Sequence, residues 1–546
     1  MGFGLHCQAA EPWGARRGPT FQLVGEMRVK RPIEMLEGAV WALRNQISAV
    51  ANQPERTLLL GTVLLVSAVS AVVGYVLTQY YSVDVLSSLV SNPEDCIINW
   101  GPHFGSHCFS DYNLPVSWGM RPNPWAPYPL FWPPDYQPAH PNYPAAAMVP
   151  QLIFGLLAKW LSAPQLGLLG YLLALTIAVL TPAVWAARGA RGLERIVVFV
   201  TCGASAIPAW MVLDRANSVA LLAPVGLGFL VALCRQRWGL VAIMVVLATL
   251  IKPQFAVLAV VLFAARQWRM GGVAIAGAVT SSLAAYLLWP RDFPATIAQS
   301  IHSTLNYGSP QLAVGFRNVS FGRALMLIPD GVKAFQSGGK IPDGFLAGPR
   351  SFAGYAVLVV IVAAVLALGP RIPRVLTGIM LLAGATLFPA LVFHYYLVFV
   401  LPVAALVVRD PDGPPGAGIF HQLATHGGRR RAVGICVSLA VALSITQVAL
   451  PGRPLPEPIY GQILGQPGVI GVIGTRPLVS TTVFLVPIVW LIACAAIIVS
   501  YARRPASLDR TDRGQTQECS PDSSDSAFST SSCTSEPESL HRARRN

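Results

Sequence analysis

A succession of long apolar stretches, dominated by Leu, Val and Ala, constrains the fold of this chain more than any other feature. The hydrophobic fraction is 53% and the charged fraction only 12% over 546 residues, which is too apolar for an ordinary soluble domain. Backbone polar groups in lipid must form hydrogen bonds within their own segment, so such runs predict transmembrane helices. The sequence therefore predicts an all-α polytopic membrane protein.

Twelve spans are predicted from apolar length. They are 57–79, 165–187, 196–213, 216–234, 237–251, 254–265, 271–289, 353–370, 375–391, 395–408, 432–451 and 477–500. With the N-terminus in the cytoplasm, the short loops rich in arginine all fall on the cytoplasmic side. Their arginines are Arg188, Arg191, Arg195, Arg235, Arg237, Arg266, Arg269, Arg371, Arg374 and Arg429 to Arg431. This orientation requires that the apolar stretch 145–161 does not cross, so we predict a juxtamembrane helix at the outer interface there.

The polar ends of the chain flank a transmembrane domain predicted over 57–501. Residues 1–56 are expected to be cytoplasmic, with an amphipathic helix over 33–50 and no cleavable signal peptide. Residues 502–546 are rich in Ser, Pro and charged residues, which predicts a disordered cytoplasmic tail without a catalytic role. The protein is therefore expected in the plasma or inner membrane.

Two long segments, 80–164 and 290–352, are predicted to be external. The first carries five acidic residues against a single basic one, Arg121, together with four Trp and a dozen Pro between residues 80 and 144. The acidic residues are Asp84, Glu94, Asp95, Asp111 and Asp135. Carboxylates, aromatic rings and stiff turns beside a bilayer favour a site for a substrate that carries a sugar and a lipid. The second segment places several cations opposite this acidic loop.

Cys96 and Cys108 are the two cysteines predicted to lie in an external loop, where a disulfide between them is plausible. The indoles of the first loop allow two interpretations. Trp118, Trp125 and Trp132 could form an interfacial belt, which we favour, or a stacking platform for sugars.

The net charge of +14 does not indicate nucleic-acid binding, because the Lys and Arg residues cluster beside apolar spans as topology determinants. No Gly-rich phosphate loop and no large soluble domain suited to a nucleotide are evident. No cofactor is therefore expected, and an activated substrate should be a lipid. A metal is neither required nor excluded, because no cluster has ligand spacing.

Inverting glycosyl transfer needs a carboxylate that takes the proton of the acceptor hydroxyl while the anomeric carbon gains positive charge. It also needs cations for the departing phosphate. Asp111, in Ser110-Asp111-Tyr112, is the preferred base because its aromatic neighbours would partly desolvate it. Asp84, just past the first span, is the alternative, and a turn-forming role in a solvated loop is the competing interpretation of Asp111.

Several further segments follow Asp111 in a recognisable order. Tyr143-Pro144-Ala145 enters an apolar stretch, Asp214-Arg215-Ala216-Asn217-Ser218 opens a predicted span, and Leu250-Ile251-Lys252-Pro253 lies between two short ones. Phe316-Arg317-Asn318-Val319-Ser320 and Phe393-His394-Tyr395-Tyr396 come later. Over roughly 80–410 this order resembles the GT-C superfamily of polyprenyl-phosphate-dependent glycosyltransferases, most closely family 87, which contains actinobacterial mannosyl- and arabinofuranosyltransferases. The chain departs from the family pattern at Ala145 and at Asp214 to Asn217.

The resemblance implies a GT-C-type bundle with juxtamembrane helices in its first external loop. It also implies a set of residues that bind the donor phosphate or the substrate: Lys252, Arg317, His394, Asp214, Arg215, Asn318 and Tyr143. Purely structural interpretations remain open for several of these residues. Lys252 could snorkel from a helix break. His394 could be an interfacial histidine. Arg323, which lies close to Arg317 in the sequence, is more simply a loop charge.

The leading hypothesis is an inverting glycosyltransferase that moves a sugar from a polyprenyl-phosphate donor to a glycan or glycolipid acceptor on the outer face of the membrane. Mannose is slightly favoured over arabinofuranose. A polytopic transporter or flippase for lipid or sugar is the alternative, but it should show paired ionisable residues within spans and two similar halves. Neither is evident in the sequence, and a scaffold role would be supported only by the tail.

Overall fold

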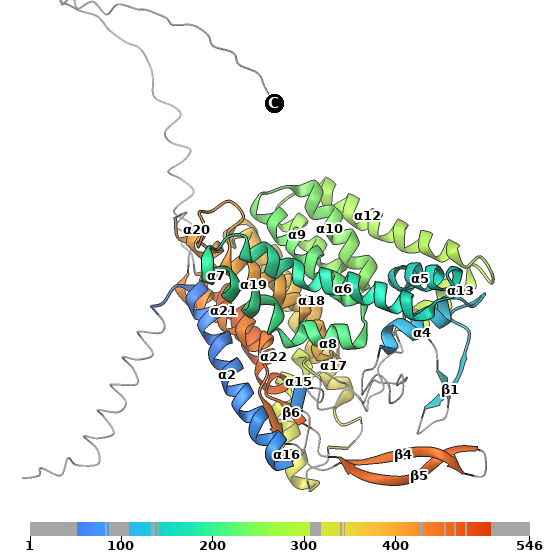
Figure 1. Cartoon of the computed structure of the whole chain (residues 1–546). Helices are drawn as coiled ribbons and strands as arrows, with labels where there is room; N and C mark the ends of the chain where they lie inside the picture. The colour runs from blue at the N-terminus through green and yellow to red at the C-terminus, as the bar shows by residue number, and fades with distance from the viewer. Residues whose placement is uncertain are drawn as a thin grey trace, which may run out of the picture.

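The computed structural model describes residues 52–81, 85–86, 109–132, 137–139, 141–305, 318–338, 341–342, 344–425, 430–451, 455–463, 466–475 and 478–503. This part of the chain is mostly helical (Figure 1). Five helices in it are long and apolar enough to cross a membrane, or six when one bent pair counts as a single span. The fold is thus that of a helical membrane protein. The predicted amphipathic helix 33–50 and all but the first two residues of the predicted tail lie outside the described residues.

The five long spans are Glu55–Tyr81 (α2), Pro164–Ala187 (α6), Trp268–Leu288 (α12 and η5), Ala347–Arg371 (α17 and η6) and Thr482–Ala502 (α22). The bent pair joins Gly192–Ala204 (α7 and η2) to Ile207–Arg215 (α8) at 45°. Shorter apolar helices are Ala145–Trp160 (α5), Ser218–Cys234 (η3 and α9), Trp238–Ile251 (α10), Pro253–Ala264 (η4 and α11), Arg374–Leu387 (α18), His394–Val408 (η7 and α19) and Arg431–Ile445 (α21). Each predicted span overlaps one of these segments, but only the five long helices and the bent pair meet the length and composition of a membrane span.

Helix ends differ from the prediction mainly near the C-terminus. The predicted span 432–451 divides into α21 and the strand Ala449–Pro451 (β3), and 477–500 begins with the strand Leu478–Ser480 (β6) before α22. The strands β3 and β6 pair antiparallel, so the sheet joins the ends of two neighbouring helices. Apolar composition alone could not separate these strands from the helices beside them.

Two further pairs of strands occur in the described residues. Tyr128–Trp132 (β1) pairs with Gln137–Ala139 (β2), and Leu455–Ile463 (β4) pairs with Gln466–Thr475 (β5). Both pairs are antiparallel hairpins. The β4–β5 hairpin is a feature that the sequence analysis did not predict.

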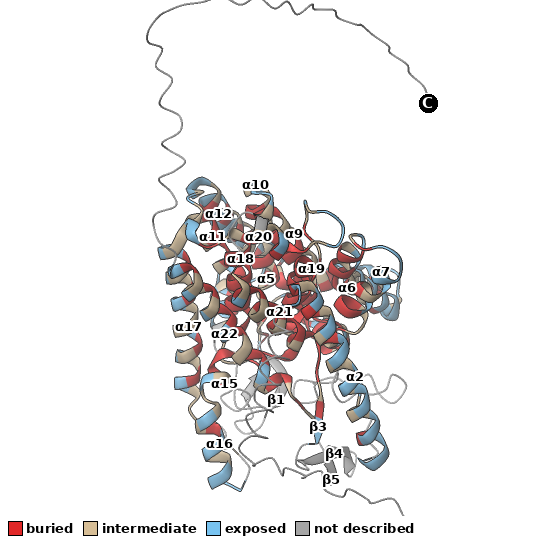
Figure 2. Ribbon diagram, turned by 90° about the vertical axis from the view of Figure 1, so that its left-hand side faces the viewer, coloured by how far each residue is buried: buried red, intermediate tan, exposed pale blue. Residues whose placement is uncertain are grey.

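Short helices form the centre of the bundle and long helices its outside. Every residue of Val400–Val408 (α19) and nearly every residue of α18 is buried, whereas only 17% of the apolar window of α2 or α17 is buried. Figure 2 shows long exposed stretches on α2 and α17. Their exposed residues include apolar ones such as Val72 and Val360. Apolar surface turned outward along a full span is what lipid contact requires.

The arginine-bearing loops gather at one end of the bundle, which we call the arginine end. It comprises residues 52–57, 185–195, 235–238, 264–269, 369–374, 409–421 and 430–431. Ion pairs join these loops, with Arg56 2.7 Å from Glu194, Arg431 3.0 Å from Glu55 and Arg235 2.9 Å from Asp412. The Arg374 guanidinium also lies 5.2 Å from the Trp238 ring. Loops that the charge pattern assigned to one side of the membrane are therefore neighbours in space.

Gly354 of α17 faces α18 so closely that a methyl group there would meet backbone. A Cβ at this position would lie 2.0 Å from the Phe388 carbonyl oxygen, whereas a Cβ at Gly348 in the same helix would meet nothing within 4 Å. We expect Gly354→Ala to destabilise the protein by about 1–3 kcal/mol, because the two helices must separate. Gly348→Ala should be neutral or slightly stabilising. Thermal unfolding in detergent compares the two variants, and equal midpoints would contradict this packing.

Candidate functional site

Asp111 lies in the first turn of a short buried helix, Ser110–Gly119 (α4). The residue before the helix, Phe109, has φ 31°, and its amide donates to the Asp214 carbonyl oxygen at 2.9 Å. A negative charge in the first turn interacts favourably with the helix dipole. Asp111 itself is 8% exposed, so it is not the solvated turn residue of the competing interpretation.

Three side chains from distant segments donate to the Asp111 carboxylate. Tyr143 Oη donates to Oδ1 at 3.1 Å, Arg215 Nε to Oδ2 at 3.2 Å and Asn217 Nδ2 to Oδ2 at 2.9 Å. An ionised carboxylate offers about four acceptor positions. These bonds fill three of them, and no other described residue donates to the fourth position, on Oδ1.

The two donors on Oδ2 reach Asp111 because the chain turns sharply between them. Arg215 ends α8, Ala216 adopts a left-handed conformation with φ 53°, and Asn217 caps η3 by accepting the Val219 amide at 2.9 Å. A left-handed alanine is strained and persists only where its surroundings fix it. Arg215 is 1% exposed and Asn217 1%, so this turn delivers two buried polar groups to one carboxylate.

Tyr143 is held by a cluster of buried aromatic residues. The Trp125 indole donates to the Tyr143 carbonyl oxygen at 3.0 Å, and its ring lies 5.1 Å from that of Tyr286 and 5.6 Å from that of Trp289. Trp118 belongs to the same cluster. Neither interpretation is therefore correct for Trp118 and Trp125, which are core residues at 7% and 1% exposure, not a belt or an open stacking platform. The side chain of Trp132 lies outside the described residues.

Lys252 lies beside this group, between two tyrosine rings. Its ammonium nitrogen is 4.2 Å from the Tyr143 ring centroid and 5.9 Å from that of Tyr396. Among the residues that the structure describes, it makes no ion pair. A cation over the face of an aromatic ring keeps its charge while it is partly desolvated. The site thus contains an ammonium group next to the carboxylate network.

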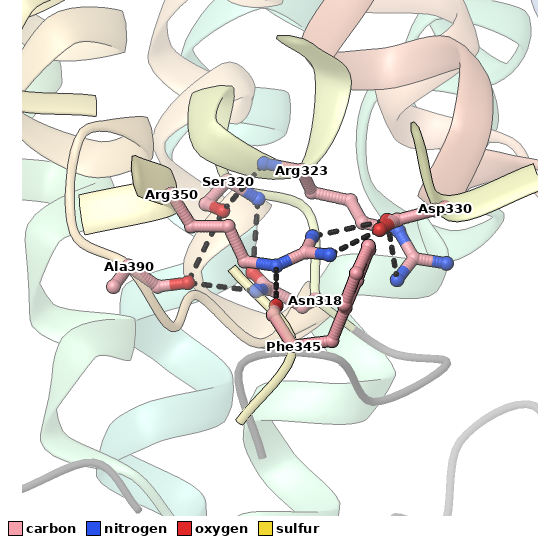
Figure 3. Close-up of polar contacts among 7 residues, drawn as sticks. All are labelled: Asn318, Ser320, Arg323, Asp330, Phe345, Arg350 and Ala390. Atoms are coloured by element: carbon pink, nitrogen blue, oxygen red, sulfur yellow. Dashed lines mark hydrogen bonds and ion pairs between the residues drawn. The ribbon is translucent and has the colours of Figure 1, made fainter. Parts of the chain in front are cut away.

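Asn318 serves a structural purpose in the described part of the chain. Its Oδ1 accepts the amide of Ser320 at 3.0 Å, and its Nδ2 donates to the Ala390 carbonyl oxygen at 2.7 Å (Figure 3). Its Oδ1 also accepts the Val392 amide at 3.1 Å. It also forms a β-bridge with Phe393, directly before His394. Asn318 therefore fixes the chain that enters η7.

His394 begins η7 and is 2% exposed, so it is not an interfacial histidine. The η7 segment packs against α8 and η3, the elements that carry Arg215 and Asn217. His394 is two residues from Tyr396, whose ring faces Lys252. The structure thus places His394 on an element that adjoins the site.

Arg323 belongs to a buried ion cluster and is not a simple loop charge. Asp330 in Leu327–Gln336 (α16) lies 3.4 Å from Arg323 in Phe321–Leu325 (α15), and both terminal nitrogens of Arg350 donate to it (Figure 3). Burial lowers the pKa of Arg323, and Asp330 opposes that shift. A Cβ at Gly322 would lie 2.3 Å from the Arg350 carbonyl oxygen, so α15 and α17 touch here. The cluster braces the segment that begins with Asn318.

The structure brings together Asp111, Tyr143, Arg215 and Lys252 from the predicted set, and Asp214 contributes through its backbone. Asp84, Arg317, Cys96 and Cys108 lie outside the described residues. Asn217 and Tyr396 were quoted in the sequence motifs without a role, and their contacts with Asp111 and Lys252 now give them one. An Asn-Ser pair before an apolar run was the available signal for Asn217, since Asn favours helix caps.

Tyr112 lines the same region. Its ring stacks on that of Tyr171 at 5.2 Å, and burial raises the pKa of Tyr112 above its ordinary value of 10.0. Tyr112 therefore stays a neutral phenol at physiological pH.

No group of three or more His, Cys, Asp or Glu side chains in the described ranges could hold a metal ion. No protein-family model matches the chain, and no curated protein matches it. The described site therefore consists of a buried carboxylate with three donors and an ammonium group that share Tyr143.

The buried pair Asp111–Arg215 should show strong energetic coupling. We expect Arg215→Met to lower the free energy of unfolding by about 3–5 kcal/mol, because it leaves a buried carboxylate without its cation. The double variant with Asp111→Leu should lose less than the sum of the single variants, with a coupling of at least about 1 kcal/mol.

The exposed pair Arg235–Asp412, 37% and 49% exposed at the arginine end, is the matched control. Its coupling should be about 0–1 kcal/mol. Chemical unfolding in detergent measures both cycles, and a coupling at Asp111–Arg215 as small as the control would contradict the buried network.

Proposed function

We propose that the protein is an integral-membrane inverting glycosyltransferase that uses a polyprenyl-phosphate sugar. The acceptor is a cell-envelope glycan or glycolipid on the outer face of the membrane, and mannose is the first sugar to test, ahead of arabinofuranose. One observation carries the proposal: Asp111, held by Tyr143, Arg215 and Asn217, shares Tyr143 with the Lys252 ammonium, which lies 4.2 Å from the Tyr143 ring centroid. The two charged groups that such a reaction needs therefore contact the same tyrosine.

Asp111 is the general base. A carboxylate accepts a proton only in its ionised form, and three donors point at the two oxygens of Asp111. The open position on Oδ1 takes a hydrogen bond from the acceptor hydroxyl, whose oxygen then attacks the anomeric carbon as its bond to the donor phosphate breaks. The proton passes to Asp111, and inversion follows because the nucleophile and the leaving group occupy opposite faces of the sugar.

Lys252 receives the leaving phosphate. That group gains negative charge as the bond breaks, so a nearby ammonium stabilises the transition state more than the bound donor. The two tyrosine rings keep the Lys252 side chain in place without neutralising it, as a carboxylate would. Arg317 and His394 are further proposed donor contacts.

The position of the site along the helices favours a reaction at the outer face over one at the arginine end. The site and the arginine end lie at different ends of the same helices: Arg215 ends α8 and Glu194 lies near the start of α7, in the same bent pair. Under the positive-inside rule the arginine end is cytoplasmic. The site is then external, where a polyprenyl lipid presents its sugar to envelope acceptors.

Purified protein incubated with radiolabelled polyprenyl-phosphate mannose or arabinofuranose and envelope acceptors tests the proposal. Label should pass to the acceptor from one of the two donors. Movement of labelled donor between vesicle leaflets without any transfer would favour the transporter alternative and overturn the enzyme.

Asp111→Asn should reduce transfer at least about 100-fold, because the amide keeps the shape of the side chain but cannot act as a base. Donor binding, measured separately with labelled lipid, should stay within about three-fold, since a lost base changes the transition state and not uniform binding. Asp412→Asn at the arginine end removes an exposed carboxylate far from the site and should keep full activity. Full activity of Asp111→Asn in a folded preparation would refute the assignment.

A further inference from the structure

An apolar groove of about 400 Å³ runs along the outward face of α6 toward the arginine end. Ile177, Leu180 and Val184 form its wall, and Trp185 and Arg188 close it. Ile177 is 63% exposed and Val184 39%, within a span whose exposed side chains are apolar, so this face meets lipid.

The threonines of the groove do not make it polar. Thr176 and Thr181 each donate their hydroxyl to the carbonyl oxygen four residues earlier, at 2.8 Å and 2.7 Å. Their methyl groups remain available to line the groove. The surface is therefore suited to a hydrocarbon chain, and a charged group stands at one end only.

Guanidinium groups converge at that end. Arg409 lies 4.5 Å from the Trp185 ring and donates to the Trp185 carbonyl oxygen. A Cβ at Gly189 would fall 2.8 Å from Cδ of Arg409, so the arginine packs directly on the backbone there. Burial lowers the pKa of Arg409, and the charges of Arg188 and Arg235 lower it further.

Nearby carboxylates do not cancel this charge. Asp412 pairs with Arg235 at 2.9 Å, and Asp410 accepts the Asp412 amide at 3.1 Å. Three guanidinium groups thus face two carboxylates, and one of these carboxylates is engaged with Arg235. Arg188 at the mouth of the groove is exposed and makes no ion pair with a described residue.

We propose that this groove binds one anionic phospholipid, with an acyl chain along Ile177, Leu180 and Val184 and the phosphate at Arg188. Trp185 would lie at the boundary between the acyl chain and the headgroup, where indoles are favoured. Basic pockets on transmembrane helices bind anionic headgroups by this combination of charge and apolar wall. The site is separate from the proposed catalytic site and does not depend on the proposed reaction.

The test compares the full-length protein in detergent with added phosphatidylglycerol or phosphatidylcholine, followed by thermal unfolding. A ligand that binds only the folded state raises the unfolding midpoint in a saturable way. Phosphatidylglycerol should do so and phosphatidylcholine should not. Inorganic phosphate at the same concentration should also have no effect, because the apolar wall contributes binding.

Two variants distinguish the contribution of the Arg188 charge to lipid binding from that of the apolar wall. Arg188→Gln should weaken the apparent Kd for phosphatidylglycerol about five-fold, as expected for one basic residue near a headgroup. Leu180→Trp should weaken it without a change of charge, because the larger side chain fills the groove. Arg195→Gln removes an exposed arginine from the neighbouring helix α7 and should leave the Kd unchanged.

Equal stabilisation by both lipids would overturn the proposal. So would an equal loss of affinity in Arg188→Gln and Arg195→Gln, because that outcome indicates diffuse surface charge. Stabilisation by inorganic phosphate alone would instead assign the cluster to a free anion and refute the lipid site.

Discussion

The buried interaction of Asp111 with Arg215 determines how the segment that begins with α4 attaches to the bundle. Its partners are 104 residues apart in the sequence, and the bond from Asn217 spans 106. Two charges removed from water remain compatible with folding only when hydrogen bonds satisfy them. The contacts that hold α4 against α8 therefore also form the candidate site. A change in this helix packing would also change the geometry of the site.

Backbone strain is concentrated around this interaction. Phe109 and Ala216, with φ 31° and 53°, are non-glycine residues in the left-handed region on the two segments that meet at Asp111. Each such residue costs about 1–3 kcal/mol and persists where the surroundings over-determine it. The amide of Phe109 bonds the Asp214 carbonyl oxygen, so the two strained turns support each other. This rigidity keeps the open acceptor position of Asp111 in one place.

The helices could be predicted from the sequence because the lipid constraint is local. A segment in hydrocarbon must satisfy its own backbone, so apolar length located the apolar helices, α18 and α19 included, but not the short polar ones such as α4 and α16. The site was predicted only in part. The family resemblance implied site roles for Lys252, Tyr143 and Arg215. The role of Asn217 depends on the left-handed conformation of Ala216, which no sequence pattern predicts. Trp125 was misjudged because its indole finds a buried acceptor in the Tyr143 carbonyl oxygen.

Charge is used differently at the two ends of the bundle. At the arginine end the pairs are partly exposed, as with Arg235 and Asp412, so water and salt weaken each one and several are needed to hold the loops together. Around Asp111 and Asp330 the partners are buried, and salt screens them little. Exposed arginines remain available to lipid headgroups, whereas buried ones are committed to a carboxylate. The same residue type therefore joins exposed loops at one end of the bundle and holds buried carboxylates elsewhere.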